Sequence, residues 1–169
     1  MASNKATWIR NLDGAQEPLV ILGLFQAGAT AAVKRGEILE LSSSNWIPLD
    51  ADQSMAGVIA VANEEIKSGD RAGYYEIIIP RPGDVFEFEL AAAGATALGT
   101  ALYFSTSQKL TVSAGTNVVG RAVGQEHYPQ KQGHLADDAG GDAGTTVRST
   151  SYVRMTFTKA ASYYAVLVQ

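Results

Sequence analysis

The residues best suited to acid–base or metal chemistry gather in one polar stretch of the chain. Both histidines, His127 and His134, lie within residues 125–146. The same stretch contains three aspartates, namely Asp137, Asp138 and Asp142. Imidazole and carboxylate groups bind divalent cations, but their spacing here matches neither the EF-hand loop nor the glycine-rich calcium repeat. We therefore favour a solvated polar loop over a weak cation site.

Other stretches imitate catalytic motifs without completing them. Glu87 and Glu89 resemble a pair of catalytic carboxylates, yet alternation along an amphipathic strand explains their spacing equally simply. The glycine-rich residues 94–99 lack the Lys-Ser/Thr of a phosphate-binding loop. The chain has no cysteine and no Gly-x-Ser-x-Gly elbow. We predict that the protein is not an enzyme and needs no metal or cofactor.

Composition excludes some further classes of protein. The 169 residues predict a single domain, and their net charge of −4 argues against binding to nucleic acid, which requires clustered basic residues. The only adjacent basic pair is Lys34-Arg35. Residues 1–10 lack the apolar core of a signal peptide, and no run approaches the roughly 20 apolar residues of a membrane helix. We expect neither export by such a signal nor a membrane partner.

The elements that would position functional groups occur in two similar series. The pentapeptide Ala-Gly-Ala-Thr-Ala is found at residues 27–31 and again at 93–97. An alignment of the residues that follow gives these matches: Gly36 with Gly99, Leu39 with Leu102, Ile47 with Leu110, and Gly57 with Gly120. The pattern predicts two copies of one unit of roughly 65 residues, as pseudo-repeats 19–83 and 84–169.

Short β-prone runs separated by turn residues predict strands throughout both copies. The expected strands are residues 19–25, 37–41, 46–49, 57–61, 74–79, 85–90, 101–104, 109–112, 118–123, 147–158 and 163–168. No segment has sustained helical periodicity. The predicted class is all-β, a β-barrel or β-sandwich of about ten short strands built from an internally duplicated unit.

The N-terminal residues have large apolar side chains in a polar context. We predict that residues 1–18 form an arm ahead of a single β domain at 19–169, and that Trp8, Ile9 and Arg10 contact a partner. The alternative is that Trp8 begins the first strand and packs in the core of its own chain.

The order of short phrases along the chain resembles a known family. Gly-x-x-Leu-x-Leu/Phe-Ser occurs at residues 36–42 and 99–105, each time followed by a turn and return strands. A Val-Gly-Arg-Ala-Val-Gly phrase at 119–124 then precedes a variable loop and a final hairpin. This order resembles the capsid decoration, or head-stabilising cement, proteins of tailed bacteriophages, over residues 23–168. The resemblance implies a small all-β homotrimer on the outer face of the capsid, with an N-terminal arm on the shell and no catalytic residues.

These observations lead to one expected function and one alternative. We expect a structural virion protein, made in the host cytoplasm, that binds the exterior of an assembled capsid and bridges its subunits. Its partners would be the major capsid protein and further copies of itself. The alternative is another phage structural module, such as a head fibre base, a tail tube or an adhesin domain. A hydrolase or lyase on a β-barrel would need convergent titratable groups, of which the sequence supplies too few.

Overall fold

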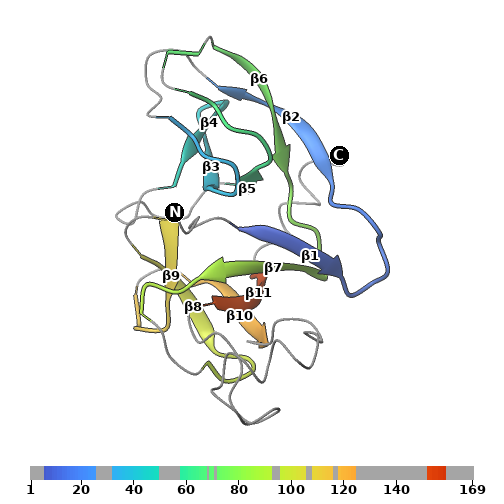
Figure 1. Cartoon of the computed structure of the whole chain (residues 1–169), viewed down its shortest axis with the longest axis vertical. Coiled ribbons are helices and arrows are strands. Elements are labelled where there is room, and N and C mark those ends of the chain that lie inside the picture. Colours follow the sequence, from blue (N-terminus) through green and yellow to red (C-terminus); the bar gives the residue numbers. More distant parts are fainter. Residues whose placement is uncertain are drawn as a thin grey trace, which may run out of the picture.

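The computed structural model describes residues 6–25, 32–49, 58–67, 69–70, 72–92, 96–105, 108–115, 118–124 and 152–158. Within these residues the chain forms two antiparallel sheets, one of six strands and one of five. They are stacked along the long axis of the molecule (Figure 1). The predicted all-β class is confirmed. In this part of the chain no helix is long and apolar enough to cross a membrane.

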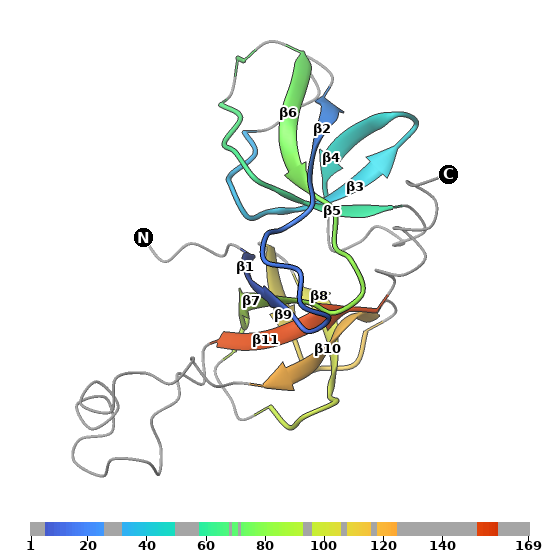
Figure 2. The same cartoon turned by 90° about the vertical axis from the view of Figure 1, so that its right-hand side faces the viewer.

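Each sheet is built almost wholly from one half of the chain. The first sheet contains, in spatial order, β2 (Val20–Phe25), β6 (Gly73–Ile78), β5 (Ile59–Ala62), β3 (Ile38–Ser42) and β4 (Asn45–Pro48). The second contains β1 (Thr7–Asn11), β7 (Asp84–Glu89), β11 (Tyr152–Phe157), β10 (Val118–Gly124), β8 (Ala101–Ser105) and β9 (Lys109–Thr111). Strand β1 lies on the side of the second sheet that is nearest the first sheet in both views (Figures 1 and 2).

Apart from β1, the second sheet repeats the strand order of the first. Strands β7, β11, β10, β8 and β9 take the places of β2, β6, β5, β3 and β4. The turn before β3 and the turn before β8 are also alike, because Gly36 N–H donates to Ala62 O at 2.7 Å and Gly99 N–H donates to Ala122 O at 2.8 Å. Both glycines adopt a left-handed conformation, with φ of 88° and 82°, which side chains disfavour. The internally duplicated unit is therefore present in the fold.

The hydrogen bonds change part of the alignment made from sequence. Since Ala62 and Ala122 accept equivalent bonds, Gly120 lies at the position of Ala60. The alignment had matched Gly120 with Gly57, which is outside the described residues. A small residue is needed at Gly120 because a Cβ there would overlap the Met155 methyl group on the neighbouring strand.

The hairpins shift the alignment at a second position. Leu41 pairs with Trp46 in the first hairpin, and Phe104 pairs with Leu110 in the second. Leu110 therefore corresponds to Trp46 and not to Ile47. The turn of the second hairpin is one residue longer, since Ser42 pairs with Asn45 but Ser105 pairs with Lys109. Without this correction every later side chain of the strand would be placed on the wrong face.

The central strands of the first sheet are buried on both faces, against different neighbours. One face packs on the second sheet, and its members are Ile38, Leu49, Ile59, Val61 and Ile78, in contact with a core that includes Phe86, Phe88, Leu102 and Met155. The other face forms a separate cluster of Phe25, Val33, Leu39, Trp46, Ala60, Ala62, Ile66, Ile77 and Ile79. Burial on both sides explains why β3 and β5 lack clean alternation of polar and apolar residues.

The two copies fill equivalent interior space in different ways. The pairing registers place Gly23 of β2 where Phe88 stands in β7. A Cβ at Gly23 would lie only 2.5 Å from Cδ1 of Trp46, so the indole occupies the space that a side chain would need. In the second sheet Phe88 fills that space, and Leu110 is smaller than the corresponding Trp46. Volume is exchanged between the two positions, as close packing of a core requires.

A glutamine joins the two sheets through the backbone. Gln108, in the turn between β8 and β9, accepts a hydrogen bond from Ile38 N–H at 2.7 Å and donates one to Leu49 O at 2.8 Å. Ala6 N–H likewise donates to Gly36 O at 2.8 Å, so the start of β1 is attached to the first sheet. These bonds satisfy buried backbone groups where the sheets meet.

Candidate functional site

Residues at the N-terminus form an edge strand within their own chain. Strand β1 pairs antiparallel with β7, with Trp8 opposite Phe86 and Asn11 opposite Asp84, and a register shift between Trp8 and Arg10. The edge of β7 has backbone N–H and C=O groups that need hydrogen-bond partners, and β1 of the same chain supplies them. This corrects the picture of residues 7–11 as a free arm, and it agrees with the alternative interpretation of Trp8. A contact of Trp8, Ile9 and Arg10 with a partner stays a prediction.

A buried carboxylate holds β1 in place. Asp84 is 1% exposed and accepts hydrogen bonds from Trp8 Nε1 at 2.9 Å and from Asn11 Nδ2 at 2.9 Å. It also accepts bonds from the backbone N–H of Arg81 at 2.8 Å and from Arg81 Nε at 3.2 Å. The carboxylate oxygens are occupied by donors from three residues, so Asp84 has a structural role and is poorly placed to act as a base.

The same cluster ties down the segment that follows β1. The Arg81 guanidinium forms an ion pair with Asp84 and also donates to the backbone oxygen of Glu17. Arg81 belongs to the turn between β6 and β7, so one cation joins that turn to the chain before β2. Sequence reasoning missed both residues. The available signal was an aspartate directly after the Pro-Arg-Pro-Gly turn, a position from which its side chain can accept turn N–H groups.

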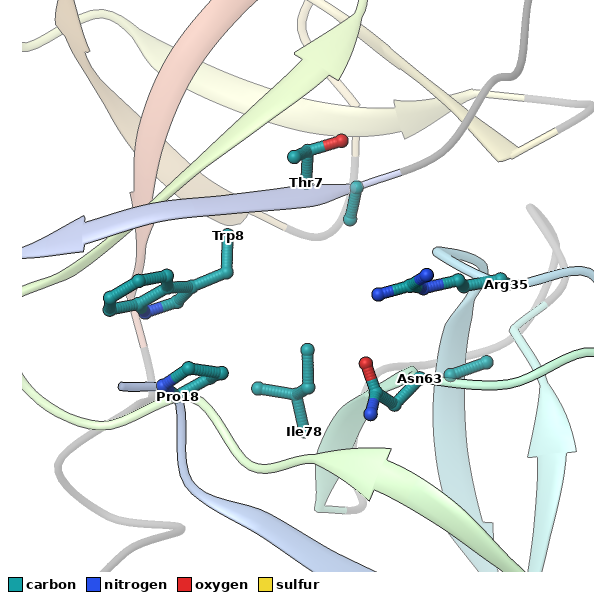
Figure 3. Close-up of a pocket in the computed structure, with 8 residues that line it drawn as sticks. Thr7, Trp8, Pro18, Arg35, Asn63 and Ile78 are labelled. Atoms are coloured by element: carbon teal, nitrogen blue, oxygen red, sulfur yellow. The ribbon is translucent and has the colours of Figure 1, made fainter. Parts of the chain in front are cut away.

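A pocket of about 460 Å³ opens between β1 and the first sheet. The indole of Trp8 and the ring of Pro18 face each other at one end, and Ile78 lies between the two ends (Figure 3). Arg35 and Asn63 stand at the opposite end, with the Arg35 guanidinium directed into the pocket (Figure 3). The remaining lining residues are Ala6, Thr7 and Ala62. Of the three residues predicted to touch a partner, only Trp8 lines this pocket.

The chemistry of this lining suits binding better than catalysis. None of its residues is a histidine, aspartate, glutamate or cysteine, so it holds no ready general base or thiol nucleophile. No described residue forms an ion pair with Arg35. Trp8, Pro18 and Ile78 provide an apolar surface beside that cation. Such a pocket can accept an apolar side chain whose neighbouring carbonyl or carboxylate bonds to the guanidinium.

The two glutamates that imitate a catalytic pair each have a partner of opposite charge. Glu87 lies 3.2 Å from Arg154 on the neighbouring strand, and Glu89 lies 2.9 Å from Lys109. Cross-strand ion pairs of this kind stabilise a sheet. Among the described residues no group of three or more His, Cys, Asp or Glu could hold a metal ion. The polar stretch at 125–146, with both histidines and its aspartates, lies outside them.

A second surface feature is apolar and belongs to β2 and β6. Val20, Leu22 and Tyr74 are 38%, 64% and 67% exposed. The registers place Leu22 at the position of Glu87 in the second sheet. The ion pair of Glu87 with Arg154 in the second sheet is therefore replaced by an exposed leucine in the first.

The sequence matches none of the family models and none of the curated proteins with which it was compared. The Trp8 pocket and the exposed face of β2 and β6 are therefore the candidate binding surfaces.

Proposed function

We propose that the protein is a structural component of a tailed-phage virion that binds the outer surface of the assembled capsid and stabilises it by bridging capsid subunits. The observation that carries this proposal is the folding of the two Gly-x-x-Leu-x-Leu/Phe-Ser phrases. They form equivalent hairpins, β3–β4 and β8–β9, in sheets of the same strand order. The phrases at residues 36–42 and 99–105, which carry part of the resemblance to decoration proteins, are thus structural repeats, and this regularity supports the proposal.

The candidate surfaces support binding as the role of the protein. The Trp8 pocket offers apolar rings beside the Arg35 guanidinium, which forms no ion pair with a described residue, and the Asp84 carboxylate is saturated with donors. Neither arrangement presents a group ready for proton transfer. Exposed apolar surface and a pocket for an anchoring side chain are features of surfaces that bind other proteins.

Stabilisation of the capsid would follow from mass action. A ligand that binds only the assembled shell lowers the free energy of that state, by about 2.7 kcal/mol when present at 100 times its Kd. Association of the protein with itself, as a homotrimer, would let several weak contacts act together. The partners are then the major capsid protein and further copies of this chain, on the capsid exterior.

The test uses capsids assembled without this protein from the major capsid protein of the same genome. We expect saturable co-sedimentation of the purified chain with these shells, and a higher melting temperature of the decorated shell. The variant Arg35→Ala, which leaves the packed core intact, should bind more weakly than Gln16→Ala, a change at an exposed residue. Absence of the protein from purified virions would refute the proposal, and its localisation on tails or fibres would favour the other virion modules.

A further inference from the structure

One edge of the first sheet is uncovered in the part of the chain that the structure describes. Strand β2 pairs with β6 on one side, and no described strand pairs with it on the other. At its C-terminal end Gly23 lies against Trp46 of β4. The first half of β2, residues 19–22, is the open part of the edge.

The backbone of this open half presents hydrogen-bonding groups outward. Ile79 N–H donates to Leu19 O at 2.9 Å, so Leu19 and Ile21 bond toward β6. In an antiparallel pair the intervening residues direct their N–H and C=O groups away from the partner strand. Val20 and Leu22 therefore offer their backbone groups to an incoming strand.

The duplicated fold identifies what belongs at such an edge. β7 occupies the position of β2 in the second sheet, and its edge is covered by β1 through pairs from Asp84 to Glu87. Beneath that cover Val85 is 1% exposed, whereas Val20 at the equivalent position is 38% exposed. Among the described strands, the first sheet thus has no counterpart of the strand that covers the edge of the second.

The composition of β2 also departs from that of an ordinary free edge. Natural proteins protect such edges with charged side chains, proline or a bulge, because an unprotected edge pairs with other chains. Residues 20–25 read Val-Ile-Leu-Gly-Leu-Phe, without a charge or a proline. The register of β2 with β6 is regular from Val20 to Phe25, so there is no bulge either. This edge has the properties of a pairing surface.

We infer that the open edge of β2 accepts, as an added antiparallel or parallel strand, residues 163–168 of a second copy of this chain. This segment reads Tyr-Tyr-Ala-Val-Leu-Val, lacks any charge, and is as long as β2 itself. The sequence predicts a strand there, and the segment lies outside the described residues. Tyrosine and β-branched valine are the residues that favour strand addition. Its alternate side chains cover Val20 and Leu22 as β1 covers Val85.

The inference rests on the self-association included in the proposed function, but it involves no capsid. Failure of capsid binding would therefore leave it standing. It is tested on the isolated full-length protein, through the position of the segment and through the oligomeric state.

Position can be tested by cross-linking, because the chain contains no cysteine. A tagged copy with Leu22→Cys is co-expressed with untagged copies that carry one cysteine at successive positions from 163 to 168. Neighbouring residues of a strand point to opposite faces, so the disulfide yield between copies should peak at one position and be low at the positions beside it. The control replaces Leu98, a leucine before β8 that is 78% exposed, against 64% for Leu22. A flat yield, or an equal yield with Leu98→Cys, would overturn the inference.

A single chain that carries both Leu22→Cys and the best cysteine of the series shows which copy supplies the strand. Covalent oligomers are expected on oxidation. A monomer closed by an internal disulfide would overturn the assignment to a second copy, because the segment would then cover β2 of its own chain.

The oligomeric state gives an independent readout. Leu22→Lys places a charge on the open edge opposite Glu76, as Glu87 faces Arg154 in the second sheet, so the fold should tolerate it. We expect the wild type to be oligomeric by light scattering and Leu22→Lys to have the mass of one chain with unchanged far-UV circular dichroism. Leu98→Lys should stay oligomeric. The inference would be wrong if the Leu22→Lys variant stayed oligomeric. It would also be wrong if the wild type were a monomer and Leu22→Lys weakened only its binding to the capsid.

Discussion

The Asp84 cluster makes the sharpest prediction about what holds the N-terminal strand. Asp84→Ala removes the acceptor of the Trp8 indole N–H, of the Asn11 amide and of the Arg81 backbone N–H. A buried donor left without a partner costs about 1–3 kcal/mol, and loss of one member of a buried ion pair costs about 3–5 kcal/mol. The Arg81 side chain is 20% exposed, so water partly solvates its freed charge. We expect a loss of about 3–5 kcal/mol in the free energy of unfolding.

Urea denaturation followed by far-UV circular dichroism measures this loss, and a second substitution tests its cause. Trp8→Phe deletes one donor of the cluster and should cost about 1 kcal/mol for the bond, in addition to lost packing. In the Asp84→Ala background the bond is already absent, so the two costs should not add and the coupling should be about 1 kcal/mol. Asp13→Ala, at an exposed aspartate, is the control. A cost below 1 kcal/mol for Asp84→Ala, or strict additivity with Trp8→Phe, would refute the reasoning.

Three further substitutions test the packing of the two copies by thermal or urea unfolding. Gly23→Ala should destabilise the fold because its Cβ meets the indole of Trp46. Trp46→Leu in the same chain should restore part of the lost stability. If it does not, the two positions do not share one interior space. Gly120→Ala should cost several kcal/mol because its Cβ would overlap Met155. Gly73→Ala is the control and should change stability little, since its Cβ meets nothing closer than 3.9 Å. Equal effects of the two substitutions would argue against the overlap with Met155. Gln108→Ala should cost about 1–3 kcal/mol because it frees backbone groups of Ile38 and Leu49 in the first sheet; a neutral result would show that water replaces the amide.

Local pattern was enough to predict β2 to β11, whereas β1 was expected to be part of an arm, and the strand expected at 163–168 lies outside the described residues. The alternation of Phe86 and Phe88 with Glu87 and Glu89 places the phenylalanines in the core and the glutamates on the opposite face, where they are half-buried in ion pairs. This prediction succeeds because the two-residue period of a strand depends only on neighbouring residues. The duplicated unit was also visible, since its turn glycines must adopt a left-handed conformation and so recur at Gly36 and Gly99.

The candidate sites were not visible in the same way, because they depend on contacts between distant residues. Trp8 and Asp84 are 76 residues apart in the sequence, which is longer than one repeat, and nothing near either residue indicates the other. The repeat alignment failed at Gly120 and Leu110 because hairpin length and interior volume, both properties of the folded copy, decide which residues correspond.

Composition and periodicity therefore determined the all-β class, the duplication and the faces of the amphipathic strands. Tertiary structure alone decided that β1 covers the edge of β7, that Asp84 is buried among donors, and that no described strand pairs with the outer edge of β2. The physical reason is the same in each case. A strand edge or a buried carboxylate can be satisfied by any segment with suitable groups, and only the folded chain selects which segment reaches it.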